Sequence, residues 1–283
     1  MVAMIDSVIQ KGRIYYTRLS NWKSKVDLKI DMGPYTLQMA QSKEQVLECF
    51  KLRYEVFCHE MAGKPKKVGL DYDRYDAVCD HLIIVHQESQ KIVGTYRMNF
   101  SGTSDMFYTD SEFQMESWLN RQSAEQSLFI ELGRACIHHE HRRGSVIALL
   151  WRGIAEYMKL MGAESLIGCS SVKVTDARSA ALIYKYFELK GVLAAEIFEP
   201  RSKYAMPDLT FWLMVFSSGL TEDQMQEAEE KIPSLLKSYL KAGAKVASYP
   251  AYDEEFRCID FATMLNRNDL DQKLVKKFNV EKS

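Results

Sequence analysis

The spacing of the apolar residues limits the fold of this chain more than any other feature, because it changes repeatedly between two periods from residue 34 onward. Alternation over two residues predicts a strand, whereas apolar residues three and four apart predict a helix. The expected elements, in chain order, are strand 35–40, helix 42–57, strands 81–86 and 92–100, strand 127–138, helix 144–162, strand 165–170, helix 176–190 and strand 209–216. This order predicts an α/β fold (mixed α+β), with a central mixed sheet flanked by helices on both faces.

The two ends of the chain differ from this central part, which we expect to be one domain over residues 34–216. Residues 1–33 place Tyr15 and Trp22 on one helical stripe among several Lys and Arg residues. Such a segment is either a helix that rests on an anionic membrane surface or an extension of the folded body. Residues 217–283 contain further helix-start signals and are expected to be a helical and strand lobe packed on the same domain.

The composition excludes several classes of protein. With 37 Lys and Arg against 38 Asp and Glu, the formal net charge is −1, which argues against a nucleic-acid-binding protein. No apolar run approaches the roughly 20 residues of a membrane span, and no secretory signal opens the chain. None of the six cysteines forms a CxxC pair, so we expect reduced thiols, a cytoplasmic location and no metal.

Glu131 is the most unusual polar residue, because it lies inside the apolar strand 127–138. A buried carboxylate is costly unless it is paired or its pKa rises. One interpretation is a structural ion pair between Glu131 and Arg97 or Arg53. The other is that Glu131 accepts a proton during catalysis.

Two further clusters of titratable residues have interpretations of their own. Asp71, Asp73 and Asp76 form either a solvated acidic loop or a functional one, and the glycine and final glutamate of an EF-hand are missing. The run from His138 to His141 contains three imidazoles and Glu140. Strand alternation is expected to place the adjacent imidazoles on opposite faces, which argues against a metal site.

The predicted start of a helix at Gly144 and Ser145 is a candidate anion site, because free N–H groups and the positive end of the helix dipole lie there. Arg142 and Arg143 precede it. The alternative is a plain helix start with surface arginines.

Taken together, these clusters resemble the ornithine N-acyltransferase branch of the GNAT superfamily. More distantly, they are similar to acyl-homoserine-lactone synthases and long-chain N-acyl amino acid synthases. The similar segments are Arg53–Phe57, Asp71–Asp76, His81–Ile83, Gly94–Arg97, Glu131–Arg134, Leu150–Trp151, Gly168–Ser171, Leu235–Tyr239, Lys241–Ala244, Pro250–Asp253 and Asp260–Phe261.

The resemblance implies an N-acyltransferase that moves a 3-hydroxy fatty acyl group from acyl carrier protein to the α-amine of an amino acid, with ornithine the first candidate. Where acetyl-CoA-dependent relatives have a glycine-rich pyrophosphate loop, residues 141–146 keep only Gly144. Val146 lacks the backbone freedom that a closely approaching diphosphate requires. This departure favours the single phosphodiester of a carrier-bound 4′-phosphopantetheine thioester, with no bound cofactor. Such carriers are acidic, so Arg142, Arg143 and the lysines of residues 64–67 are candidate docking charges.

The resemblance also implies roles for individual residues. The predicted catalytic residues are Glu131 as the base, with Arg97 and Arg134. The predicted acceptor-binding residues are Arg53, Phe57, Asp71, Asp73, Asp76, Ser170 and Ser171. The predicted donor-binding residues are Cys136, Arg142, Arg143, Gly144 and Ser145. The expected lining of an acyl tunnel is Phe57, Phe100, Phe113, Trp118 and Phe129, with plain core packing as the alternative.

Three other functions stay open at this point. They are an acyl-homoserine-lactone synthase, an acetyl-CoA-dependent acetyltransferase, and an inactive scaffold that binds carrier protein. Peripheral contact with the inner face of a membrane is also left open.

Overall fold

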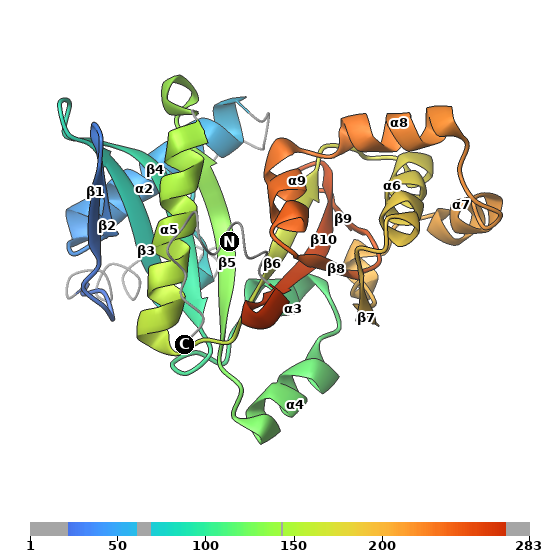
Figure 1. Cartoon of the computed structure of the whole chain (residues 1–283), viewed down its shortest axis with the longest axis horizontal. Helices are drawn as coiled ribbons and strands as arrows, with labels where there is room; N and C mark the ends of the chain where they lie inside the picture. Colours follow the sequence, from blue (N-terminus) through green and yellow to red (C-terminus); the bar gives the residue numbers. More distant parts are fainter. Residues whose placement is uncertain (1–21, 61–68, 143, 270–283) are drawn as a thin grey trace, which may run out of the picture. The chain divides into compact units, whose positions relative to one another are not determined.

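The computed structural model describes residues 22–60, 69–142 and 144–269. They divide into two compact units (Figure 1). The first contains residues up to Asn99 together with Arg134–Leu160, and the second contains Phe100–Gly133 together with the residues from Met161 onward.

The strands of the first unit are antiparallel neighbours in the order β1, β2, β3, β4. Their bounds are β1 Lys29–Met32, β2 Tyr35–Met39, β3 Asp80–His86 and β4 Lys91–Phe100. The end of β5 (Phe129–Ile137) lies beside β4, since the amide of His138 donates to the carbonyl of Val93 at 2.8 Å. The strands predicted at residues 81–86 and 92–100 are both present, and they pair with each other as antiparallel neighbours.

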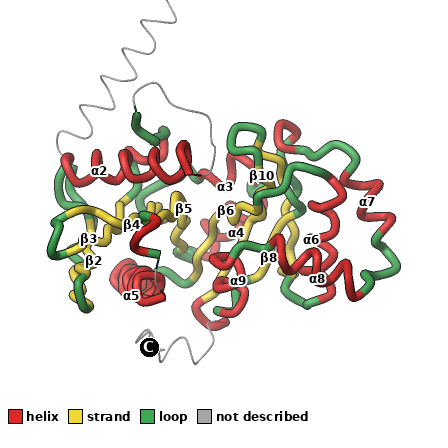
Figure 2. The backbone as a smooth tube through the Cα atoms, turned by 90° about the horizontal axis from the view of Figure 1, so that it is seen from above, coloured by secondary structure: helices red, strands yellow, loops and turns green. Residues whose placement is uncertain are grey.

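Helices α2 (Lys43–Tyr54) and α5 (Gly144–Met161) cover opposite faces of this sheet (Figure 2). Ile83 packs with Phe50 of α2 in one core cluster. Its neighbour Leu82 faces α5, where a Cβ added to Gly153 would lie 3.0 Å from the Leu82 side chain. Successive residues of β3 thus bury their side chains on both faces, as expected for a strand covered twice.

The first helix ends differently from the prediction. Ser42 accepts from the amide of Gln45 at 3.3 Å, as the capping signal predicts. The α-helical hydrogen bonding ends at Tyr54, however, and Glu55–Glu60 continue as a π-helix. Such wider turns occur frequently at functional sites.

The second unit contains a mixed sheet. Its strand order is β5, β6, β10, β8, β7, with β9 also paired to β10. β6 is parallel to β5, β10 is antiparallel to β6 and β8, and β8 is parallel to β7. The bounds are β6 Ser165–Val172, β7 Leu193–Phe198, β8 Lys245–Ser248, β9 Ala251–Asp253 and β10 Cys258–Asn266.

Helices cover both faces of this sheet as well. Phe261 belongs to a core cluster with α6, α7, α8 and α9, whereas its neighbour Ala262 belongs to a cluster with Phe113 and Trp118 from the segment of α3 and α4. The bounds are α3 Tyr108–Glu112, α4 Glu116–Glu125, α6 Ala177–Leu189, α7 Leu209–Val215, α8 Glu222–Lys231 and α9 Ser234–Lys241. The predicted mixed sheet with helices on both faces is confirmed.

The prediction of a strand at residues 209–216 is wrong, because Leu209–Val215 form helix α7. Trp212 and Leu213 pack against the core, while Phe211 and Met214 are 60% and 70% exposed. A short run that is apolar at every position except Thr210 has no periodicity to distinguish a strand from a helix.

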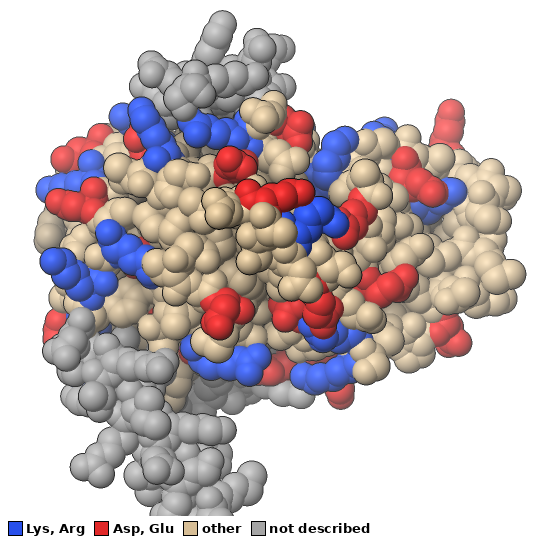
Figure 3. Space-filling view, turned by 90° about the horizontal axis from the view of Figure 1, so that it is seen from below, with Lys and Arg blue, Asp and Glu red and all other residues tan. Residues whose placement is uncertain are grey.

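No helix among the described residues is long and apolar enough to cross a membrane. Acidic and basic side chains are interspersed on the face drawn in Figure 3, in keeping with the balanced composition. The predicted membrane-facing stripe lies largely in residues 1–21, outside the described residues. The predicted boundaries at residues 34 and 217 stay a prediction.

Candidate active site

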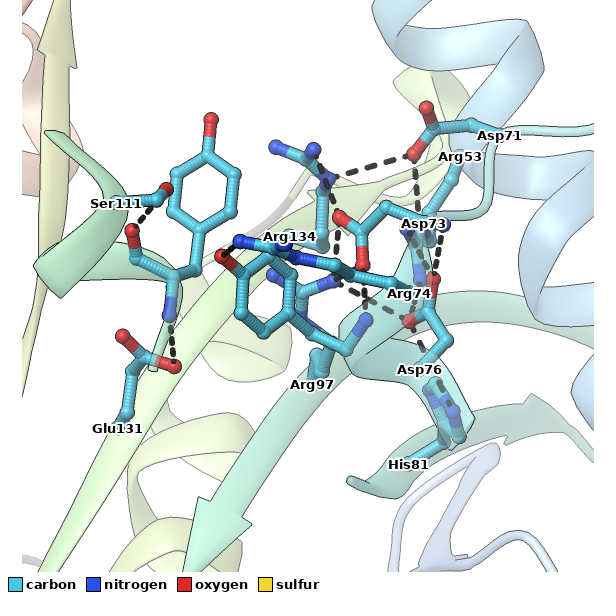
Figure 4. Close-up of polar contacts among 12 residues, drawn as sticks. Arg53, Asp71, Asp73, Arg74, Asp76, His81, Arg97, Ser111, Glu131 and Arg134 are labelled. Atoms are coloured by element: carbon cyan, nitrogen blue, oxygen red, sulfur yellow. Dashed lines mark hydrogen bonds and ion pairs between the residues drawn. The ribbon is translucent and has the colours of Figure 1, made fainter. Parts of the chain in front are cut away.

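Arg53 holds the acidic loop from the end of α2 (Figure 4). Its Nε donates to Asp71 Oδ2 at 2.9 Å, and its Nη1 donates to Asp76 Oδ1 at 2.7 Å. The Arg53 side chain is 1% exposed and both carboxylates are fully buried. Buried charges of this kind persist only when they are paired and hydrogen-bonded. The expected contact between Arg53 and the acidic loop is present, and a solvated loop is wrong for Asp71 and Asp76.

Two more arginines bind Asp73, the remaining aspartate of the loop. Arg97 Nη1, from β4, lies 2.7 Å from both oxygens of Asp73, and Arg134 Nη2, from β5, donates to Asp73 Oδ2 at 3.1 Å. Burial alone would raise the pKa of Asp73, but the two guanidinium groups hold it well below its ordinary value. We call this set the Arg–Asp cluster: Arg53, Arg97, Arg134, Asp71, Asp73 and Asp76.

The spacing of the aspartates has a local cause. Asp73 accepts from the amide of Tyr75 at 2.9 Å, and Asp76 accepts from the amide of Asp73 at 2.8 Å. These reciprocal bonds form a capping box at the start of the 3-10 helix Arg74–Ala77. The Asp-x-x-Asp pattern therefore fixes the backbone that presents both carboxylates to the arginines.

His81 is buried behind Asp76, with Nε2 4.0 Å from Asp76 Oδ1. Its ring packs near Trp22 and Phe50, with centroids 5.3 and 5.6 Å away. Burial lowers the pKa of His81 to about 4, so the imidazole is neutral near pH 7.

Glu131 lies in the second unit and accepts hydrogen bonds from two backbone amides at the start of α3. The amide of Tyr108 donates to Oε2 at 2.9 Å, and that of Thr109 donates to Oε1 at 2.6 Å. The Glu131 residue is 3% exposed. A carboxylate at a helix N-terminus is stabilised by the free N–H groups there. The hydrogen bonds that Arg53 and Arg97 donate, described above, are accepted by the aspartates of the loop and not by Glu131.

Strand β5 departs from regular geometry just after Glu131. The parallel register with β6 covers Phe129 to Glu131, and Arg134 has a φ of +53°, in the left-handed region. Backbone strain of this kind is often found at functional sites. A Cβ on Gly168 of β6 would lie 2.3 Å from the carbonyl oxygen of Leu132, so this close approach of the two backbones requires glycine.

Ser170 and Ser171, the predicted acceptor-binding residues of β6, face different partners. The hydroxyl of Ser170 lies 2.8 Å from that of Thr263, and Ser171 donates to Asp260. Cys169, between Gly168 and Ser170, donates to Glu112 Oε2 at 3.4 Å. Asp260 and Glu112, which accept two of these hydrogen bonds, belong to a buried acidic group for which the sequence predicted no role.

That group is Glu112, Asp253 and Asp260, whose ligand atoms lie within 4.8 Å of one another. We call it the acidic trio. Its members are far apart in the sequence and come from α3, β9 and β10. Only the antiparallel register of β9 and β10 brings two of them together, and residues 253 and 260 were recognised only through the resemblance.

The predicted donor site lies at the start of α5. Gly144 and Ser145 are exposed, and a Cβ on Gly144 would meet nothing within 4 Å. Arg142 binds Glu60 and donates from Nε to the carbonyl of Ile137 at 2.9 Å. Arg143 and the lysines of residues 64–67 lie outside the described residues.

Cys136 and Phe57 lie in the same core cluster as Leu52 and Val56. Burial raises the pKa of the Cys136 thiol well above its ordinary value, so it remains a thiol. A contribution of Cys136 to donor binding would therefore come from its backbone. Of the predicted tunnel residues, Phe113, Trp118 and Phe129 pack in one buried cluster, as plain core residues do.

The expectation that adjacent imidazoles point apart is wrong for His138 and His139. Their ring centroids are 4.4 Å apart, because β5 ends at Ile137 and a 3-10 helix follows. With Glu140 they could place three ligand atoms within 4.8 Å. His139 and Glu140 are exposed, however, and such surface groups are common without a metal.

Comparison with known proteins defines the class. Residues 52–152 match the family model described as an acetyltransferase (GNAT) domain. The chain is therefore an acyltransferase that contains a GNAT domain over residues 52–152.

Its curated relatives are more specific. The chain is 28% identical to L-ornithine N(alpha)-acyltransferase from Rhizobium meliloti (strain 1021), over 81% of this chain and 78% of the relative. It is 27% identical to the enzyme of the same name from Agrobacterium fabrum (strain C58 / ATCC 33970), over 83% and 81%. A solved N-acyl amino acid synthase from uncultured soil microbes matches with a TM-score of 0.49 and 9% identity, over 89% of this chain and 100% of that one. The predicted resemblance to the ornithine N-acyltransferase branch is confirmed by the curated relatives.

Proposed function

We propose that this protein transfers a 3-hydroxy fatty acyl group from acyl carrier protein to the α-amine of L-ornithine, giving a lyso-ornithine lipid. One observation carries the proposal: the similarity to proteins named L-ornithine N(alpha)-acyltransferase extends over 81–88% of the chain and is not confined to the GNAT domain. Similarity of this extent includes the second unit, where Glu131 and the acidic trio lie.

The donor would enter at the start of α5. The exposed Gly144 and Ser145 offer helix N-terminal amides to one phosphodiester, as in a 4′-phosphopantetheine arm. Arg142 and Arg143, with the lysines of residues 64–67, supply positive charge for an acidic carrier protein. These features support the carrier protein over free CoA as the donor.

The reaction is direct aminolysis of a thioester. The lone pair of the acceptor's α-amine attacks the thioester carbon, the N–C bond forms, and the C–S bond breaks to release the pantetheine thiol. Glu131 takes the amine proton, directly or through water. Backbone N–H groups of residues 134–136 stabilise the oxyanion, in the part of β5 that follows the strained Arg134.

The remaining predicted roles are part of the same proposal. In the first unit, Arg97 and Arg134 are candidate catalytic residues and Phe57 is a candidate acceptor-binding residue. In the second unit, Ser170 and Ser171 are candidate acceptor-binding residues. The Arg–Asp cluster keeps the acidic loop in one conformation, and residues 1–33 provide a peripheral contact with the membrane that receives the product.

The test is a product assay with the full chain, 3-hydroxyacyl carrier protein and ornithine, with lipid extraction and mass spectrometry. N-acylated ornithine is the expected product. An acylated neutral amino acid in its place would overturn the acceptor. A lactone formed from S-adenosylmethionine would indicate an acyl-homoserine-lactone synthase, and product from acyl-CoA alone would overturn the donor.

A further inference from the structure

The acidic trio buries three carboxyl groups in the second unit. Glu112 ends α3, Asp253 ends β9 and Asp260 lies in β10, and they are 0%, 5% and 3% exposed. Burying one carboxylate is costly, and a second or third like charge nearby adds to the cost unless a cation or protons compensate.

The protein satisfies part of this trio with neutral donors. Asp253 Oδ1 accepts from the amides of Glu255 and Phe256, at 2.7 and 3.1 Å. Asp260 accepts from the hydroxyl of Ser171. Glu112 is different: Oε2 accepts from the thiol of Cys169, but the buried Oε1 has no hydrogen-bond partner among the described residues. Its oxygens lie within reach of the other two carboxylates, so the trio contains a buried acceptor that lacks a donor.

Glu112 and Asp253 also lack the kind of countercharge that the Arg–Asp cluster contains, among the described residues. No Lys or Arg in the described part of the chain forms an ion pair with Glu112 or Asp253. Burial raises the pKa of Glu112 well above its ordinary value, and the nearby carboxyl groups of Asp260 and Asp253 add to this effect. In the Arg–Asp cluster, by contrast, three guanidinium groups accompany three carboxylates. Glu112 and Asp253 are therefore buried acidic groups without a basic partner in the described part of the chain.

The short helix α3 connects the trio to the candidate base. Glu131 binds the first amides of α3, and Glu112 is its last residue. Four residues of helical rise separate the two ends by about 6 Å. The two amino groups of ornithine, joined by five single bonds, are also about 6 Å apart when extended. The thiol of Cys169 lies between the two ends of α3, since it contacts both Glu112 and Thr109.

From this arrangement we infer that Glu112, Asp253 and Asp260 bind the side-chain ammonium of the acceptor and so select a basic amino acid while Glu131 receives the α-amine proton. The inference rests on the proposed function and adds the residues that determine its acceptor specificity. An ammonium offers three N–H donors to these carboxylate oxygens. Asp71, Asp73 and Asp76, which were predicted to bind the acceptor, are not assigned this role because their carboxylates already bind arginines.

The test compares ornithine with norvaline, which has the same carbon chain without the second amine. Calorimetry on the full chain gives the two dissociation constants, and the acylation assay gives kcat/KM for both. The wild-type protein is expected to favour ornithine, and Glu112→Gln is expected to reduce that preference by about 10- to 100-fold, as for loss of a hydrogen bond to a charged group. Asp253→Asn is the second variant and should act in the same direction.

Asp110→Asn is the matched control, because Asp110 is an acid of the same helix that binds Arg201 at the surface and lies outside the trio. Its preference for ornithine should equal that of the wild type. Equal preference in well-folded Glu112→Gln and Asp253→Asn would overturn the inference. So would stoichiometric binding of Mg²⁺ or Ca²⁺ that requires Glu112, because the trio would then be a metal site.

The failure of the proposed function would look different. Ornithine that binds in a Glu112-dependent manner but is not acylated would overturn the proposed reaction and support the cation site. Acylation of ornithine that is insensitive to all three carboxylates would support the reaction and overturn the site.

Discussion

Arg53 and Asp76 are joined by two parallel hydrogen bonds, from Nη1 to Oδ1 at 2.7 Å and from Nη2 to Oδ2 at 3.1 Å. Both side chains are buried, so neither charge can be solvated if the other is removed. Arg53→Met should therefore lower the free energy of unfolding by about 3–5 kcal/mol. Arg178→Met, which breaks a partly exposed pair with Glu227, should cost at most about 1 kcal/mol. Urea unfolding measures both, and equal losses would contradict the prediction.

The pKa of Asp73 predicts a loss of stability in acid. Because its folded pKa lies below the ordinary 3.8, its contribution is complete above that value and is lost as the pH falls toward the folded pKa. The free energy of unfolding of the wild type should therefore fall more steeply below about pH 4 than that of Asp73→Asn. Urea titrations at several pH values give the two slopes, and parallel slopes would mean that Asp73 is not held ionised.

His81 acts in a higher pH range. Its folded pKa of about 4 lies below the ordinary 6.5, so the unfolded chain binds a proton that the folded protein excludes. Stability should fall between about pH 6.5 and 4, by as much as about 3 kcal/mol, since one pKa unit corresponds to about 1.4 kcal/mol. His81→Leu should remove this slope, whereas the same change at the exposed His59 should leave it in place.

Glu131→Gln should lower kcat by about 10²-fold or more if Glu131 is the base. Loss of a helix cap alone would lower stability without lowering kcat to this extent. Asp176→Asn is the matched control, because Asp176 accepts the amide of Ser179 at the start of α6. It should change stability little, because asparagine caps a helix about as well as aspartate does, and it should keep its turnover.

Gly168→Ala should destabilise the protein by about 2 kcal/mol or more, because the new Cβ would lie 2.3 Å from the backbone oxygen of Leu132. Gly144→Ala provides the contrast, since nothing lies within 4 Å of the corresponding position. Its free energy of unfolding should change by less than about 1 kcal/mol. Thermal unfolding of both variants would test the close approach of β5 and β6.

Local patterns predicted the parts of the fold that local forces determine. Ser42 and Asp176 mark helix starts through their own hydrogen bonds, and Gly162 and Gly191 have the positive φ that ends a helix. Strand β10 was missed, because adjacent residues are buried in opposite clusters and no alternation remains. The strand predicted at residues 209–216 is a helix, because a short and largely apolar run has no periodicity that distinguishes the two.

The candidate site was predicted where its residues are neighbours in sequence. Asp71, Asp73 and Asp76 form one loop, and Arg53 reaches it as expected. The acidic trio could not be found in this way, because Glu112, Asp253 and Asp260 come from a helix and two strands, and Glu112 is far from the other two in the sequence. Nor does a strand pattern show that the partners of Glu131 are backbone amides.

The Arg–Asp cluster also has a consequence for the history of the sequence. Each aspartate accepts a hydrogen bond from at least one arginine. A protein that lost one of these six residues by mutation would therefore keep an uncompensated charge in its interior. Viable descendants would reach a different arrangement only by exchanging partners together. Across relatives, these six positions should therefore be inherited as a unit, and changes at them should occur in complementary pairs.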